Sequence, residues 1–268
     1  MLKTFSFGGG RQSIAVLILA SQGKLNYDAF LFSNVGDDAE NPDTLKYFNE
    51  YALPFAQEHN LNLKEIHRIP KKGRNKGNKE SLYQNLILEN RRTIEIPILM
   101  KNGAFGRRGC THEFKIKVVG KWQKRNGATK DNPAITGIGI SLDEYKRARN
   151  KAYYEWQILE YPLLDLRLTR DDCIKIIKES GLPVPPKSAC WFCPFHSFQE
   201  WIELKKKKPE LFQKAIDLEV LLNERRKTLN KDEIFLTKKL VPLDKAFDNQ
   251  LELFDDVELT CDTGHCFV

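Results

Sequence analysis

Two groups of residues in this chain have types and spacing suited to chemistry, and the first is a glycine turn near its start. The sequence Gly8-Gly9-Gly10-Arg11-Gln12-Ser13 stands between an apolar segment that ends at Phe7 and an apolar run that begins at Ile14. Such a strand, turn and helix would leave backbone N–H groups at the positive end of a helix, which suits a phosphate. Glycines let the backbone approach an anion because no Cβ intervenes. Ligand-free α/β turns share this pattern, so both interpretations stay open on this segment alone.

The spacing of the turn excludes two common nucleotide motifs. The glycines do not follow the G-x-G-x-x-G pattern of dinucleotide-binding folds, and no Gly-Lys-Ser/Thr follows them as in a Walker P-loop. A nucleotide bound here would therefore be held by a different kind of loop.

The second group is a set of cysteines, led by the C-x-x-C pair of Cys190 and Cys193. Two thiolates at this spacing can bind one metal ion or one cluster, although a redox pair or inert thiols remain alternatives. We expect Cys110 as a third ligand and Cys266 as the fourth, with Cys261 as the alternative fourth. Four thiolates suit either zinc or an iron–sulfur cluster. Cys173 lies on the apolar face of a predicted helix, so we expect it in the core.

Composition limits the class of protein. The chain has 268 residues, 41% of them hydrophobic, and no apolar run long enough to cross a membrane, so we expect a cytoplasmic protein without a membrane partner. Six cysteines in that compartment favour metal or redox chemistry over disulfides. The net charge of +7 permits a polyanionic partner. The basic loop Lys71–Lys79 is the best candidate for contact with nucleic acid, and a merely solvated face is the alternative.

The elements that must position these residues alternate between strands and helices, which favours an α/β fold: a parallel twisted sheet with helices on both faces. We divide the chain into a nucleotide-binding domain over 1–182 and a helical, cysteine-bearing region over 183–268. The predicted strands are Lys3–Phe7, Asp28–Ser33, Leu63–Ile69, Ala134–Ile140 and 155–162. The predicted helices are Ser13–Gln22, Asp43–His59, Glu80–Asn90, Thr111–Arg125, Leu142–Tyr154, Asp171–Ser180, Ser197–Lys207 and Pro209–Leu229.

The glycine turn resembles the PP-loop of the ATP-pyrophosphatase superfamily, which has the form Ser-Gly-Gly-x-Asp-Ser. Phosphoadenylyl-sulfate (PAPS) reductases carry a version preceded by Ser-Phe, which Ser6-Phe7 matches. Gly9-Gly10 match the two glycines and Ser13 the final serine. Gly8 and Gln12 depart from the pattern, because the family has serine and aspartate there.

Four further segments are similar to the PAPS reductase-like family, in the same order and with similar spacing. The first and third segments each follow a predicted strand. The second surrounds Cys110, and the fourth contains the C-x-x-C pair. The matching segments are Asn34–Thr44, Arg108–Ile116, Gly137–Arg147 and Cys190–Cys193. Together they extend the resemblance over residues 3–195.

The resemblance implies an adenine nucleotide alpha-hydrolase-like fold and a set of binding residues. ATP, or a sulfonucleotide, would lie against the turn and three further side chains: Ser6, Gly8, Gly9, Gly10, Gln12, Ser13, Asn34, Lys115 and Arg147. The residues implied in catalysis are Ser13, Arg11, which would offset phosphate charge, and Asp37 and Asp38, which could bind magnesium.

Two departures separate the chain from true sulfate-assimilation reductases. Its end, Thr263–Val268, lacks their Glu-Cys-Gly-Leu-His motif, and Gly109 replaces the first member of their Cys-Cys pair. The chain looks closer to cluster-bearing thiolation and phosphorothioation enzymes. These imply adenylation of a substrate by ATP, pyrophosphate release, a [4Fe-4S] cluster and a sulfur donor such as a cysteine desulfurase. The alternatives are a sulfonucleotide reductase and a zinc-stapled nucleotide- or nucleic-acid-binding module without catalysis.

Overall fold

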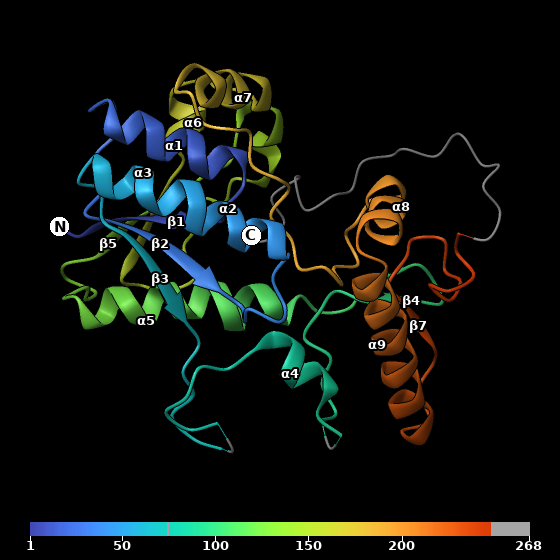
Figure 1. Cartoon of the computed structure of the whole chain (residues 1–268). Coiled ribbons are helices and arrows are strands. Elements are labelled where there is room, and N and C mark those ends of the chain that lie inside the picture. The colour runs from blue at the N-terminus through green and yellow to red at the C-terminus, as the bar shows by residue number, and fades with distance from the viewer. Residues whose placement is uncertain (74, 90, 248–268) are drawn as a thin grey trace.

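A five-stranded parallel sheet forms the centre of the computed structural model, which describes residues 1–73, 75–89 and 91–247 (Figure 1). The strand order is β3-β2-β1-β5-β6, and every neighbouring pair runs parallel. The strands are β1 (Lys3–Phe7), β2 (Ala29–Asn34), β3 (Leu63–His67), β5 (Ala134–Ile138) and β6 (Gln157–Glu160). The α/β fold predicted from the sequence is confirmed.

The strand order indicates where a ligand crevice is expected, at the middle of the sheet. The chain builds outward from β1 through β2 to β3, and then returns to the other side of β1 with β5 and β6. The connection after β1 therefore leads to one side of the sheet, toward β2, and the connection after β5 leads to the other side, toward β6. In open α/β sheets, the crevice outside the carboxyl ends of two such strands is the usual ligand site. The glycine turn follows the carboxyl end of β1.

Helices cover both faces of the sheet, as predicted. Along β2, Phe30 and Phe32 join the large core on the α1 face, whereas Ala29 and Leu31 pack against Val119 of α5 on the other face. The first face is covered by α1 (Arg11–Ser21), α2 (Pro42–Tyr47), η1 (Phe48–Ala52), α3 (Leu53–Glu58), α6 (Pro162–Asp165) and α7 (Arg170–Glu179), and the second by η2 (Thr111–Ile116) and α5 (Lys117–Arg125).

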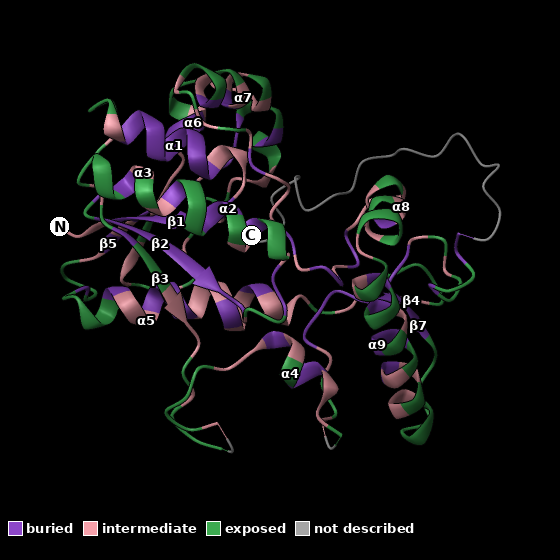
Figure 2. Ribbon diagram, in the orientation of Figure 1, coloured by how far each residue is buried: buried purple, intermediate pink, exposed green. Residues whose placement is uncertain are grey.

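Helix α1 is buried along nearly its whole length (Figure 2). Every residue from Ser13 to Ala20 is buried, because the helix lies between the sheet and α7. A helix that is apolar all round is expected to be buried in this way. Its N-terminus is thereby fixed rigidly at the crevice.

Three predicted helices differ from the structure, and one of them, Thr111–Arg125, begins with the π-helical segment η2 before it continues as α5. The segment 43–59 is a single helical path, but it contains a π-helical turn, η1, between α2 and α3. The predicted helix Leu142–Tyr154 is wrong beyond its first turns: only η3 (Leu142–Arg147) is helical, with 3₁₀ geometry. The chain turns extended at Ala148, and the Tyr161 hydroxyl then bonds both backbone groups of Arg149, at 2.7 and 2.9 Å. These bonds replace the helical ones.

A second hydrophobic core lies beside the sheet, and two parts of the chain build it. Its buried residues come from 35–114 and from 191–247. Helix α9 supplies a polar link, because the Arg225 guanidinium donates to the carbonyls of Leu86 and Leu88, at 2.8 and 2.6 Å. The elements here are α4 (Leu82–Ile87), α8 (Phe198–Lys207), α9 (Pro209–Thr228) and the two-residue strands β4 (Leu99–Met100) and β7 (Ile234–Phe235), which the sequence did not predict. In the described ranges, no helix has the length and apolar character to cross a membrane.

The buried carboxyl of Glu219 predicts a pH-dependent stability. It accepts hydrogen bonds from the Leu236 and Leu243 amides, both at 2.6 Å, and burial raises its pKa to about 7. The folded chain therefore holds a proton that the unfolded chain releases near pH 4.5, so the free energy of unfolding should fall as pH rises from about 4.5 to 7. The loss is on the order of 3 kcal/mol. Urea unfolding at pH 5 and pH 7.5 measures it, and Glu219→Gln should remove most of this slope. Equal slopes in both proteins would contradict the assignment.

Candidate functional site

The glycine turn lies between two segments that come from distant parts of the chain. Gly9 adopts a positive φ of +76°, and a Cβ there would lie 3.1 Å from the Thr44 Cγ2 methyl. A Cβ at Gly10 would lie 3.0 Å from the Ser188 hydroxyl. The predicted strand, turn and helix are present, and the turn fits its surroundings only because it has no side chains.

Polar groups at this turn are arranged to receive an anion. No side chain caps Gly10, so the first amides of α1 keep the open donors of a helix N-terminus. The Ser13 hydroxyl accepts from the Gly8 amide at 2.9 Å and closes the turn. Two further polar atoms, Arg11 Nε and Thr44 Oγ1, are buried with no hydrogen-bond partner. Buried groups of this kind usually have one, so these atoms indicate a missing polar ligand.

A buried carboxylate occupies the crevice side of the turn. The Gln12 amide donates to Glu144 at 3.4 Å, and Glu144 also contacts Arg147, at 2.9 Å, and Arg170. Burial raises the pKa of Glu144 despite the two guanidinium groups. A carboxyl group therefore lies beside Gln12, and the sequence alone does not single it out within Gly137–Arg147.

The predicted magnesium carboxylates follow β2 but are engaged separately. The side-chain amide of Asn34 donates to Asp37 at 2.7 Å, and the Asn34 side-chain oxygen Oδ1 accepts from the Gly36 backbone amide. Asp38 accepts from Ser81 and, at 2.9 Å, from Gln84. Both carboxylates are exposed, and their role stays a prediction. Ser6 lies elsewhere, on the α5 face of the sheet, where it lines a small cavity with Thr136 and Arg149.

Three predicted cysteines line one cavity. Cys110, Cys190 and Cys193 share it with the cationic side chains of Arg108 and Lys115, and the remaining lining is mostly apolar. Cys266 and its alternative Cys261 lie outside the described residues. Cys173 is fully buried in the core of the sheet domain, as predicted, and burial raises the pKa of its thiol to about 12.

Three thiols are suitable donors for a metal ion or a cluster. Their side chains, however, are not arranged in a group that could coordinate one ion. Within the described ranges, no three His, Cys, Asp or Glu side chains form a group able to hold a metal ion. Three of the four predicted ligands therefore share a place, and a closed site is not formed by them alone.

The C-x-x-C segment is fastened directly to the loop after β2. The Asn41 amide donates to the Ala189 carbonyl at 3.2 Å, and Glu40 and Cys190 form an antiparallel backbone bridge. The Trp191 indole donates to the Asp38 carbonyl at 2.8 Å. Since the Ser188 hydroxyl lies only 3.0 Å from where a Cβ of residue 10 would stand, a continuous stretch of three residues joins the surroundings of the glycine turn to the first cysteine.

Glu40 is a second buried acid that the sequence did not single out. It is 3% exposed, and burial raises the pKa of its carboxyl against the opposing effects of the Lys115 ammonium and the Val35 amide. Its backbone pairs with Cys190, and Lys115 lines the cysteine cavity. A perturbed carboxyl beside a cavity is a candidate for proton transfer or for orienting Lys115.

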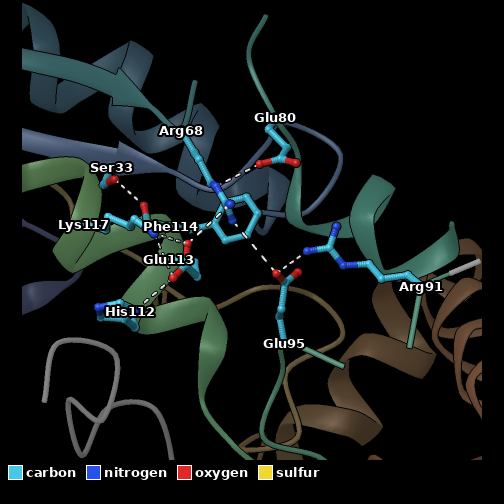
Figure 3. Close-up of polar contacts among 9 residues, drawn as sticks. All are labelled: Ser33, Arg68, Glu80, Arg91, Glu95, His112, Glu113, Phe114 and Lys117. Carbon is cyan, nitrogen blue, oxygen red and sulfur yellow. Dashed lines mark hydrogen bonds and ion pairs between the residues drawn. The ribbon is translucent and has the colours of Figure 1, made fainter. Parts of the chain in front are cut away.

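A buried ionic network holds the segment that carries Cys110 and Lys115 (Figure 3). Arg68, at the end of β3, contacts Glu80 at 2.8 Å, Glu113 at 3.3 Å and Glu95 at 4.0 Å, and its guanidinium lies over the Phe114 ring. The Glu95 carbonyl in turn accepts from the Cys110 amide. These contacts hold the start and the middle of η2, so they fix one wall of the cysteine cavity.

The fold and this site define the class only as an α/β protein with an anion-suited turn at the switch point of a parallel sheet. No protein-family model and no curated protein sequence matches the chain. Among solved structures, it is similar to the U34-tRNA thiolase NcsA from Methanococcus maripaludis, a structure that includes its [4Fe-4S] cluster. That likeness has a TM-score of 0.45 and 14% identity over 87% of this chain and 73% of the other.

Proposed function

We propose that the chain is a nucleotide-dependent enzyme of sulfur transfer, in which ATP is bound at the glycine turn and thiol chemistry takes place at the neighbouring cysteines. One observation carries the proposal. Ser188 lies against Gly10, and Cys190 follows two residues later in a cavity that it shares with Cys110 and Cys193. A phosphate-binding turn and a group of thiols thus meet at one edge of the sheet.

The turn and its neighbours would bind and orient the nucleotide. Backbone amides of α1 and the Arg11 guanidinium would face the phosphates, and the buried Arg11 Nε would gain the partner that it lacks. In adenylation, an oxygen of the substrate attacks the α-phosphorus, the bond to the bridging oxygen breaks, and pyrophosphate leaves. Arg147 and Arg170 stand beside Glu144 near Gln12, where they would stabilise the charge of the departing group.

Cys110, Cys190 and Cys193 are the residues that would hold a [4Fe-4S] cluster or a zinc ion, with Cys266 as the predicted fourth ligand. Such a group would keep an open coordination position if only these three thiolates held it, whereas Cys266 as the fourth ligand would close the site. Lys115 and Arg108 would lower the cost of the thiolate charges.

The test measures two properties of anaerobically purified protein: bound iron, zinc and acid-labile sulfide, and pyrophosphate release from ATP with candidate acceptors. Cys193→Ala is expected to lose at least half of the metal and to melt at a lower temperature, because binding energy contributes to folding energy. Cys173→Ala is the matched control, because it removes a core thiol outside the cavity and should keep the metal content.

Other outcomes distinguish the alternatives. Turnover of a sulfonucleotide with a thiol donor, without pyrophosphate release, would replace the proposal by a reductase. If the protein contains one equivalent of zinc and binds ATP without any turnover, the result would favour the zinc-stapled binding module over an enzyme. Full metal content in Cys193→Ala would overturn the assignment of the thiols.

A further inference from the structure

We propose that the groove between β3 and α5, extended by residues 71–73 and 75–79 of the adjoining loop, binds the phosphodiester backbone of a nucleic acid. The groove is a cavity of about 240 Å³. Its lining includes the cations Arg68, Lys121 and Arg125 and the half-buried ring of Trp122. The inference concerns binding alone and does not need the proposed function to hold.

The cations of this surface are available to a partner. Seven basic residues on α5 and the loop make no ion pair with a carboxylate of the described residues. Lys117 of the same helix differs, because it pairs with Glu113 at 3.0 Å. The seven are Lys71, Lys72, Lys76, Lys79, Lys121, Lys124 and Arg125. All are exposed except Lys121, which is partly buried in the groove.

The electrostatics show that these charges converge. The pKa of Lys121 is lowered by burial and then by the positive charges of Lys117, Arg68, Lys71 and Arg125. Cations from one helix, one strand end and one loop therefore repel one another across the groove. Folding keeps them together at a cost, and a polyanion would relieve that repulsion.

The acidic residues near the groove are already engaged. Glu65 lines it, but its carboxylate accepts from Asn34 at 2.6 Å and lies 3.7 Å from His67. Glu80, Glu95 and Glu113 belong to the Arg68 network. Glu80, Glu95 and Glu113 face the cations Arg68, Arg91 and Lys117, and Lys121 and Arg125 outnumber Glu65 in the lining, so the charge presented outward by the groove is positive.

The groove leads to the candidate site. The loop leaves the carboxyl end of β3 and returns through a hydrogen bond from the Glu80 amide to the Arg68 carbonyl, and its described residues lie on the α5 side of the sheet (Figure 1). β3 runs parallel to β2 and β1, so the loop begins at the same edge of the sheet as the residues that follow β2 and the glycine turn. A strand bound along the groove would thus reach the edge of the sheet that carries the glycine turn.

Fluorescence anisotropy with the full chain, without ATP, tests the inference. The probes are a labelled 20-nucleotide single-stranded RNA, the same sequence as single-stranded DNA, and its duplex. The variant Lys71→Gln/Lys121→Gln/Arg125→Gln should raise Kd at least tenfold at 0.1 M salt. It should also reduce the salt slope by about 2, since each lost phosphate contact to a single strand removes about 0.7. The control Lys24→Gln/Lys178→Gln/Lys214→Gln removes the same charge from exposed lysines elsewhere and should change Kd less than twofold.

Three outcomes would overturn the inference: equal losses in both triple variants, no binding of any probe by the wild type, or equal affinity for poly-glutamate of matched charge, which would indicate an acidic protein partner. Comparing the three probes identifies the kind of nucleic acid. If the triple variant melts at a lower temperature, the single variants Lys71→Gln and Arg125→Gln, whose side chains are exposed, replace it. Failure to release pyrophosphate would contradict the proposed function and leave this binding result unaffected.

Discussion

Gly9→Ala is expected to weaken ATP binding at least tenfold and to lower the free energy of unfolding by about 2 kcal/mol. A non-glycine residue at positive φ costs about 1–2 kcal/mol. The new Cβ would also lie 3.1 Å from Thr44 Cγ2 and 3.5 Å from Phe32, so the turn would have to move away from the buried strand. Titration calorimetry with a non-hydrolysable ATP analogue and urea unfolding measure the two effects.

The matched control lies at the other end of the same helix. Gly23 has a similar φ of +72°, but a Cβ there would meet no atom within 4 Å. Gly23→Ala should therefore lose only the backbone part, about 1 kcal/mol, and bind ATP as the wild type does. If both variants bind the analogue equally well, the glycine turn does not hold the nucleotide.

Arg68→Met is expected to lower the free energy of unfolding by about 3 kcal/mol or more. Removing one partner of a buried ionic group leaves uncompensated charge, and Arg68 is the cation that Glu80, Glu95 and Glu113 share. Burial already raises the pKa of Glu95, and loss of Arg68 would raise it further. A carboxyl with a raised folded-state pKa stabilises the fold at low pH, so acidification from pH 7 to 5 should restore part of the loss.

Lys117→Met provides the comparison, because Lys117 contacts the same Glu113 carboxylate at 3.0 Å but is 38% exposed. An ion pair of this kind contributes about 1 kcal/mol or less. Urea midpoints of the two variants at pH 7 and pH 5 complete the measurement. Equal losses in Arg68→Met and Lys117→Met, or no recovery on acidification, would contradict the role given to the network.

The elements of the sheet could be predicted because local patterns determine them. β1 agrees with its predicted bounds, and the helix predicted over Asp171–Ser180 is α7 (Arg170–Glu179), which begins with a capping box formed by Thr169 and Asp172. The proximity of Cys110 to Cys190 and Cys193 was also anticipated, because a C-x-x-C pair supplies only two ligands and needs further cysteines as partners. The end of η3 at Arg147 was missed because it depends on Tyr161, a partner that local periodicity cannot reveal.

The acidic parts of the site were missed for the same reason. Glu40 and Glu144 are ordinary loop or helix acids in sequence, and only burial beside Lys115 or between two arginines distinguishes them. The contact of Ser188 with Gly10 joins residues 178 positions apart, and no short-range pattern encodes it. Tertiary packing supplies this part of the site.

The position of Ser188 beside the glycine turn predicts a coupling between ligand binding at the turn and ligand binding at the cysteine cavity. One short stretch, Ser188–Cys190, is in contact with the turn at its first residue and with the cysteine cavity at its last. Ligands at two places that displace or order the same stretch share a coupling free energy, and coupling is reciprocal. Any factor by which a nucleotide changes the affinity of the cavity for its ligand must equal the factor by which that ligand changes the affinity for the nucleotide.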